Sequence, residues 1–136
     1  MKEFAATEWD RACRAIGSAE QLVRTDPDSA ASRAYYAAFH ALTALFALRG
    51  QAFSKHSAIR AALHRDLVQA GLLGEDVGRD YDFLMELRET ADYGGVTQVP
   101  AEAATRALER AKRFVAAIHL LCPELGRHSE GESQAP

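Results

Sequence analysis

The sequence predicts an all-α protein, an antiparallel up-and-down bundle of four long helices with a shorter fifth helix. Alanine, the strongest helix former, supplies 27 of the 136 residues, and residues that favour strands are scarce. Apolar side chains recur three or four positions apart between short breaks rich in Gly, Pro, Asp and Ser. The length fits one domain, which we place at residues 1–122. The polar segment 123–136 is predicted to be a disordered tail.

The first two helices are expected at residues 7–24 and 29–49. The segment TDPDS separates them, and Asp28 or Ser29 is the expected N-cap of the second helix. The second helix is apolar on nearly all sides, so it should lie in the middle of the bundle. Gly50 follows it, as expected of a left-handed residue that ends a helix.

The other helices are expected at residues 54–71, 75–93 and 100–121. Two glycines at 94–95 should stop the middle one of these, since glycine is unfavourable inside a helix. Pro100 suits the first position of the last helix, because its missing N–H would be unpaired there anyway.

Charge and sorting signals limit the classes of function. The net charge of −3 and a pI near 5.9 exclude a strongly basic protein that coats nucleic acid. Thirteen of the 16 basic residues are Arg, which suits a local phosphate site, although the base composition of the genome explains the same bias equally well. The acidic N-terminus does not resemble a signal peptide, and no apolar run is long enough to span a membrane. Cys13 and Cys122 are expected to be reduced, so we predict a cytoplasmic protein with no membrane contact.

Familiar catalytic and metal-binding motifs are absent from the sequence. It contains no phosphate-binding glycine loop, no HExxH and no CxxC. His56 and His64 are about 12 Å apart along a helix, too far to share one ion. We therefore predict no metal site and no cofactor.

A basic face is expected on the helix at 54–71. His56, Arg60 and His64 are four positions apart and share this face. One interpretation is a patch that faces RNA phosphates. The other is an ordinary solvated face opposite the apolar side of the helix.

Arg88 is the most unusual residue of the helix at 75–93, because it lies on or beside the apolar stripe. An Arg in that position needs a partner or an open groove. Asp92 is four residues further on and offers an ion pair. Tyr93 follows at the end of the helix, beside the two glycines.

Three segments together resemble a known family. They are SRAYYAAFH at 32–40, KHSAI at 55–59 and RETADY at 88–93. In this order and spacing they resemble the HEPN superfamily, and within it the small stand-alone proteins encoded beside minimal nucleotidyltransferases. The resemblance extends over roughly residues 5–121.

The resemblance implies a helical bundle that forms a two-fold dimer. Catalytic members are metal-independent ribonucleases, commonly toxins of toxin–antitoxin or defence pairs, with an R-x4-6-H motif in a cleft between two copies. Arg88 matches the Arg of this motif and Glu89 its polar residue. Tyr93 stands where the His is expected, and the ordinary pKa of a Tyr hydroxyl, about 10, suits a general base poorly. The family also includes pairs in which the transferase adds a nucleotide to a nearby Tyr, a role that Tyr93 could fill.

Three functions remain open from the sequence. In the first, Arg88, Asp92 and Tyr93 of two copies form a ribonuclease site, with Glu89, His56 and Arg60 binding RNA or a nucleotide. In the second, the same cleft binds RNA or a nucleotide without cleavage. In the third, the protein is a homodimer whose function is to bind a minimal nucleotidyltransferase.

Overall fold

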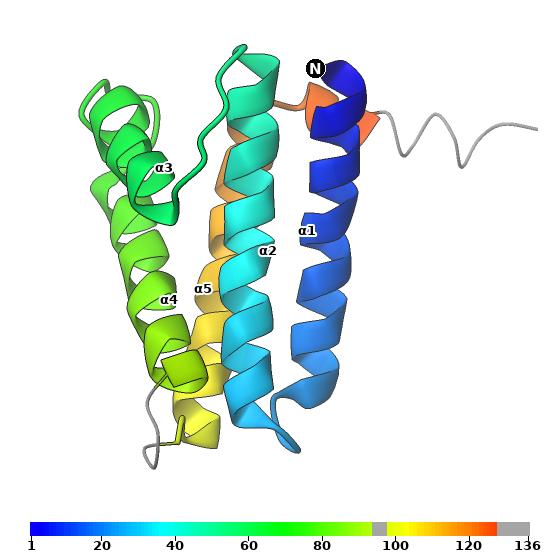
Figure 1. Ribbon diagram of the computed structural model, residues 1–136, viewed down its shortest axis with the longest axis vertical. Coiled ribbons are helices and arrows are strands. Elements are labelled where there is room, and N and C mark those ends of the chain that lie inside the picture. Colours follow the sequence, from blue (N-terminus) through cyan, green and yellow to red (C-terminus); the bar gives the residue numbers. More distant parts are fainter. Residues whose placement is uncertain (94–97, 128–136) are drawn as a thin grey trace, which may run out of the picture.

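The computed structural model, which describes residues 1–93 and 98–127, confirms the all-α prediction. Four long helices run up and down as an antiparallel bundle, and a short helical segment lies against one side (Figure 1). The elements in chain order are α1 (Lys2–Leu22), α2 (Pro27–Leu48), α3 (His56–Ala62), the π-helix η1 (Leu63–Val68), α4 (Glu75–Tyr93) and α5 (Ala101–Leu121). No strand occurs among these described residues.

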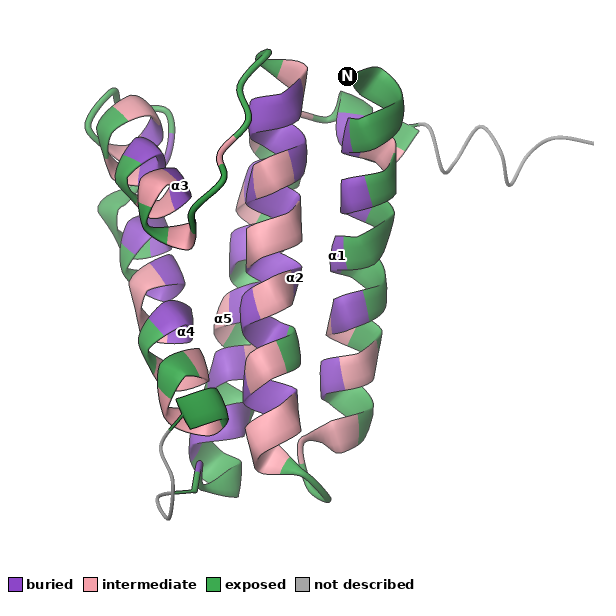
Figure 2. Cartoon of the chain, viewed as in Figure 1, coloured by how far each residue is buried: buried purple, intermediate pink, exposed green. Residues whose placement is uncertain are grey.

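Helix α2 is the central element, as its apolar sequence predicts. It packs on α1, α4 and α5, and Figure 2 shows buried residues on several of its sides. Small Ala side chains at Ala34, Ala38 and Ala41 are fully buried, so the neighbouring helices approach closely. Larger side chains such as Tyr35 and Leu42 fill the remaining space and are 0% exposed.

The ends of the first two helices differ from the prediction. Helix α1 begins at Lys2 rather than near Thr7, because the buried Ala5 continues its core-facing stripe. The N-cap of α2 is Asp26, not Asp28 or Ser29, and its carboxylate accepts hydrogen bonds from the Ser29 backbone and hydroxyl at 3.3 and 2.6 Å. The carboxylate of Asp28 instead accepts from the Val99 backbone at 2.7 Å.

The helix expected at residues 54–71 is divided. Helix α3 occupies its first part, and the wider π-turn of η1 follows it. There the His64 ring passes over Gly78 of α4, where a Cβ atom would lie 2.9 Å from it. This contact between helices outweighs the local preference for a continuous α-helix. Gly50 and Gly71 adopt the left-handed conformation that ends a helix, with φ of +77° and +81°.

The last two long helices lie close to their expected bounds. Helix α4 has the predicted ends, whereas Pro100 precedes α5 as its N-cap instead of being its first residue. Part of the expected tail, up to residue 127, forms a helical turn whose Leu125 is buried against the core. The rest, at 128–136, lies outside the described residues. Within the described part of the chain, no helix is both long and apolar enough to cross a membrane.

Candidate functional site

Arg88 lies at the centre of the candidate site, in the last two turns of α4. Its side chain is only 13% exposed. Its Nε donates to the Asp92 carboxylate at 3.0 Å, which is the ion pair that the spacing offers. Its Nη2 donates to the hydroxyl of Tyr36 on α2 at 3.1 Å. The guanidinium is therefore held from both its own helix and a neighbouring one.

Aromatic rings surround the same guanidinium. The Cζ of Arg88 lies 5.2, 5.4 and 5.6 Å from the ring centroids of Tyr35, Tyr36 and Tyr93, within the range of cation–π attraction. Burial opposes the charge, but nearby Tyr36 and the bond to Asp92 outweigh it, so the pKa of Arg88 lies above its usual value. The site thus keeps a fixed cation at all physiological pH values.

His56 reaches this cluster from the start of α3. Its Nδ1 is 2.5 Å from the hydroxyl of Tyr35. Its ring stacks on Phe39, with 4.4 Å between centroids and 14° between planes. Burial lowers the pKa of His56, and the positive charge of Arg88 lowers it further. The imidazole is therefore mainly neutral near pH 7.

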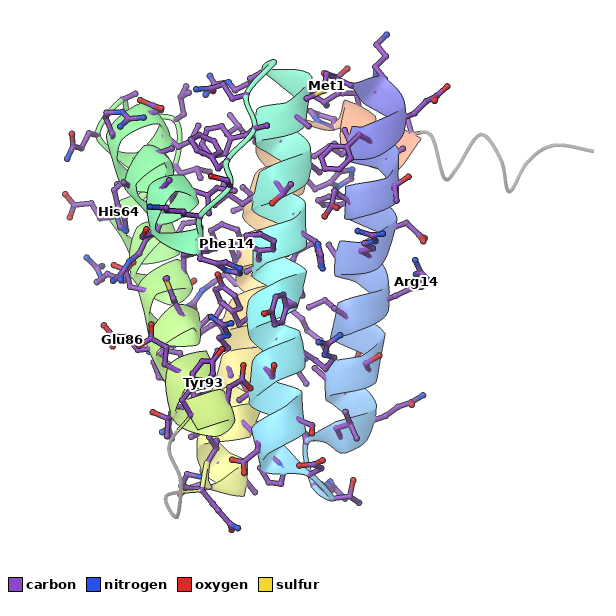
Figure 3. The ribbon with its side chains drawn as sticks, in the orientation of Figure 1. Met1, Arg14, His64, Glu86, Tyr93 and Phe114 are labelled. Atoms are coloured by element: carbon purple, nitrogen blue, oxygen red, sulfur yellow. The ribbon has the colours of Figure 1, made fainter. Side chains whose placement is uncertain are left out.

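The other two residues of the predicted basic face turn to α4 instead. Arg60 Nε and His64 Nε2 lie 2.7 and 2.9 Å from the same oxygen, Oδ1 of Asp82. The three-residue face is thus neither a free basic patch nor a fully solvated surface, since each side chain bonds a residue of another helix. Figure 3 shows His64 on the side of the molecule where α3 and η1 lie.

Tyr93 and Glu89 lie at the exposed edge of the site. Tyr93 is 73% exposed and ends α4, where Figure 3 labels it. Glu89 is exposed and close enough to Arg60 to help raise the pKa of that guanidinium, a smaller effect than the hydrogen bond that Arg60 donates to Asp82. The glycines expected to stop the helix, at 94–95, lie outside the described residues.

A polar hollow adjoins Arg88 between the start of α2 and the end of α4. Its volume is about 210 Å³. It is lined by Asp28, Ser29, Ser32, Arg33, Ala91 and Asp92. Arg33 adds a second cation, 5.3 Å from the Tyr36 ring centroid. Two serine hydroxyls and the Arg33 guanidinium line the hollow together with the carboxylates of Asp28 and Asp92. Arg88 adjoins it through its hydrogen bond to Asp92. The hydroxyls and the guanidinium are groups that can bind a phosphate.

The structure brings together Arg88, Asp92, Tyr93 and His56, and places Arg60 and Glu89 at the periphery. The sequence analysis missed Tyr36, the residue that joins α2 to Arg88. Its position in the segment SRAYYAAFH was the available signal, but helical period alone assigns such a Tyr to packing. Within residues 1–93 and 98–127, no group of His, Cys, Asp and Glu is arranged to hold a metal ion.

Comparison with known proteins agrees with this architecture. The model of the HEPN domain family matches residues 6–121. A UPF0332 protein of Thermotoga maritima is 34% identical over 128 residues, covering 93% of this chain and 97% of that protein. The chain therefore belongs to the HEPN domain family.

Proposed function

We propose that the protein is a metal-independent endoribonuclease that acts as a homodimer in the cytoplasm. Its cleft combines Arg88, Asp92 and Tyr93 of two copies. The enzyme is the toxin-like component of a toxin–antitoxin or defence pair, and a minimal nucleotidyltransferase is its antitoxin-like partner. The observation that carries this proposal is the rigidly held Arg88 beside a polar hollow.

Arg88 is suited to stabilise a phosphate whose charge increases during cleavage. Its Nε and Nη2 are engaged, but Nη1 has no hydrogen-bond partner within the described ranges 1–93 and 98–127. A donor that is fixed before the reaction needs no reorganisation when charge develops. The free edge of the guanidinium can then bind a phosphoryl oxygen of RNA.

Tyr93 supplies a hydroxyl where other family members are expected to carry His. Its exposed ring lies beside Arg88, so the hydroxyl can donate to the phosphate or to the leaving oxygen. Such a donor supports cleavage less strongly than an imidazole with a pKa near 7. We therefore expect a slow ribonuclease.

The test is induced expression of the wild-type chain and its variants, with total RNA separated on a gel. We expect growth arrest and RNA fragments with the wild type, and neither with Arg88→Ala. Purified proteins should cleave RNA equally well with and without a metal chelator. Tyr93→Phe should be slower by about tenfold, the effect of losing one hydrogen bond.

Arg79→Ala is the matched control. Arg79 lies on the same helix, is exposed, and forms an ion pair with Glu75 at 3.8 Å, so this variant should cleave like the wild type. Equal cleavage by Arg88→Ala and the wild type would contradict the proposed site. Intact RNA and normal growth with the wild type would contradict the enzymatic function.

A non-catalytic dimer is the second candidate function. Tyr93 is 73% exposed at the end of α4, which favours contact with a partner or modification by one. In this case the protein binds RNA, a nucleotide or the nucleotidyltransferase without cleavage. Two results together would support this function. A nucleotidyltransferase co-purifies with both the wild type and Arg88→Ala, and the wild type does not cleave RNA.

A further inference from the structure

A chain of hydrogen bonds connects the core of the bundle to the candidate site. The hydroxyls of Tyr81 and Tyr35 are 3.4 Å apart, and both side chains are 0% exposed. The Tyr35 hydroxyl is in turn 2.5 Å from Nδ1 of His56. His56 is partly exposed, so this chain ends at the surface beside Arg88.

The direction of the chain follows from the burial of Tyr81. The Tyr35 hydroxyl is its hydrogen-bond partner within the described residues. A buried donor left unpaired is costlier than an unused oxygen lone pair, so Tyr81 donates to Tyr35. Tyr35 then has its own proton to donate, and Nδ1 of His56 is the acceptor.

This direction determines the form of the imidazole. A neutral imidazole carries one proton, and an Nδ1 that accepts a hydrogen bond leaves that proton on Nε2. Burial of the ring and the positive charge of Arg88 favour the neutral form, because both lower the pKa of His56. Nε2 of His56 has no hydrogen-bond partner within residues 1–93 and 98–127. His56 therefore presents an N–H donor rather than a base.

His56 and Arg88 lie against the same two rings. The Cζ of Arg88 is 5.2 Å from the Tyr35 centroid and 5.4 Å from that of Tyr36. The His56 ring is 5.7 and 6.1 Å from the same two centroids. His56 and Arg88 are therefore neighbours across these two rings.

We propose that His56 is a phosphate-binding residue, which donates its Nε2–H to one oxygen of an RNA phosphate while Arg88 binds another. This inference rests on the proposed function and assigns a ligand atom within that site. It differs from a role in proton transfer, which would require a free lone pair on Nε2.

A neutral donor has a definite use in the proposed cleavage. The ribose 2′-hydroxyl loses its proton to water, and its oxygen bonds to the phosphorus while the bond to the 5′-oxygen breaks. The 5′-oxygen takes a proton from water, so the products are a 2′,3′-cyclic phosphate and a 5′-hydroxyl. His56 and Arg88 donate to the two non-bridging oxygens throughout, where hydrogen bonds strengthen as negative charge increases. A neutral imidazole can fill this role without changing its protonation.

The first test is the protonation state of His56. Long-range proton–nitrogen NMR spectra distinguish the two neutral forms of an imidazole, and comparison with His56→Gln assigns the signals. We expect the Nε2–H form at pH 7 in the wild type. In Tyr35→Phe the donor to Nδ1 is lost, so the Nδ1–H form should appear. A wild-type signal from the Nδ1–H form would overturn the proposal.

The second test is binding of a short RNA with a 2′-O-methyl group at every position, which cannot be cleaved by attack of the 2′-oxygen. His56→Ala should weaken its binding about tenfold, the effect of one hydrogen bond to a charged group. His56→Gln, which keeps an N–H donor, should recover part of the loss. His119→Ala is the matched control, since His119 lies on α5 against Trp9, and it should bind like the wild type.

The outcomes separate this inference from the proposed function. Binding that is equal in His56→Ala and the wild type would overturn the role of His56, whether or not unmodified RNA is cleaved. If binding of the modified RNA depends on His56 but unmodified RNA is not cleaved, the role of His56 is supported and the ribonuclease function is contradicted. If the wild type does not bind the modified RNA, the role of His56 is also overturned.

Discussion

Removal of the Asp82 carboxylate should loosen the contact between α3 and α4. Asp82 accepts hydrogen bonds from Arg60 and His64 at 2.7 and 2.9 Å. A hydrogen bond to a charged group contributes about 1.5–3 kcal/mol when buried, and an exposed ion pair about 0.2–1 kcal/mol. The side chains of Arg60, His64 and Asp82 are 35%, 34% and 28% exposed. Because they are only partly buried, each hydrogen bond should contribute about 1 kcal/mol. Asp82→Ala should therefore lower the free energy of unfolding by about 2 kcal/mol.

Urea denaturation measures this loss directly. At this chain length, about 2 kcal/mol corresponds to a decrease in Tm of roughly 8 °C. Hydrogen exchange should increase most in α3 and η1, because their attachment to α4 is weakened. Glu109→Ala, an exposed change on α5, is the control and should stay within 0.5 kcal/mol of the wild type, about the usual range for surface changes.

The difference in the free energy of unfolding between Asp82→Ala and the wild type should also depend on pH, and this dependence can refute the reasoning. Burial raises the pKa of Asp82, but the hydrogen bonds from Arg60 and His64 outweigh it, so the folded-state pKa is lowered. The stabilisation is therefore present above the unfolded-state value, about 3.9, and is lost as the pH falls through the folded-state value. A difference between Asp82→Ala and the wild type below 0.5 kcal/mol at pH 7, or one that grows in acid, would refute the reasoning.

Four further predictions concern the core, one turn and the site. Phe114→Ala removes a fully buried ring and should cost about 3–5 kcal/mol in urea denaturation; a cost below 1 kcal/mol would contradict its burial. Gly50→Ala places a Cβ at φ +77° and should cost about 1–2 kcal/mol by the same assay, whereas no loss would mean that the turn relaxes. The pKa of His56 is lowered in the folded state. Its contribution to the free energy of unfolding is therefore complete above the unfolded-state pKa, about 6.5, and decreases as the pH falls below that value. His56→Gln should remove this part of the pH dependence of unfolding. Tyr36→Phe removes one of the two bonds that hold Arg88 and should slow RNA cleavage about tenfold, and an unchanged rate would show that Asp92 alone positions the guanidinium.

Features within one helix were predictable from the sequence. The bounds of α4 follow from its apolar period and the breaks around it, and the pair of Arg88 with Asp92 follows from a spacing of four. The central place of α2 follows from its apolar composition. Each of these depends on residues a few positions apart, where helical geometry alone determines which side chains meet.

Only the tertiary structure decided which helix faces meet. Tyr36 and Arg88 are 52 positions apart, and the bond between them depends on how α2 and α4 pack. The hydrogen bond between His56 and Tyr35 also joins two helices. So do the hydrogen bonds from Arg60 and His64 to Asp82. Helical period identifies an apolar or a basic face, but not the helix that the face contacts or the turn at which it does so. Those choices depend on the packing of all side chains in the core at once, so the sequence identified Arg88 while the fold supplied the residues around it.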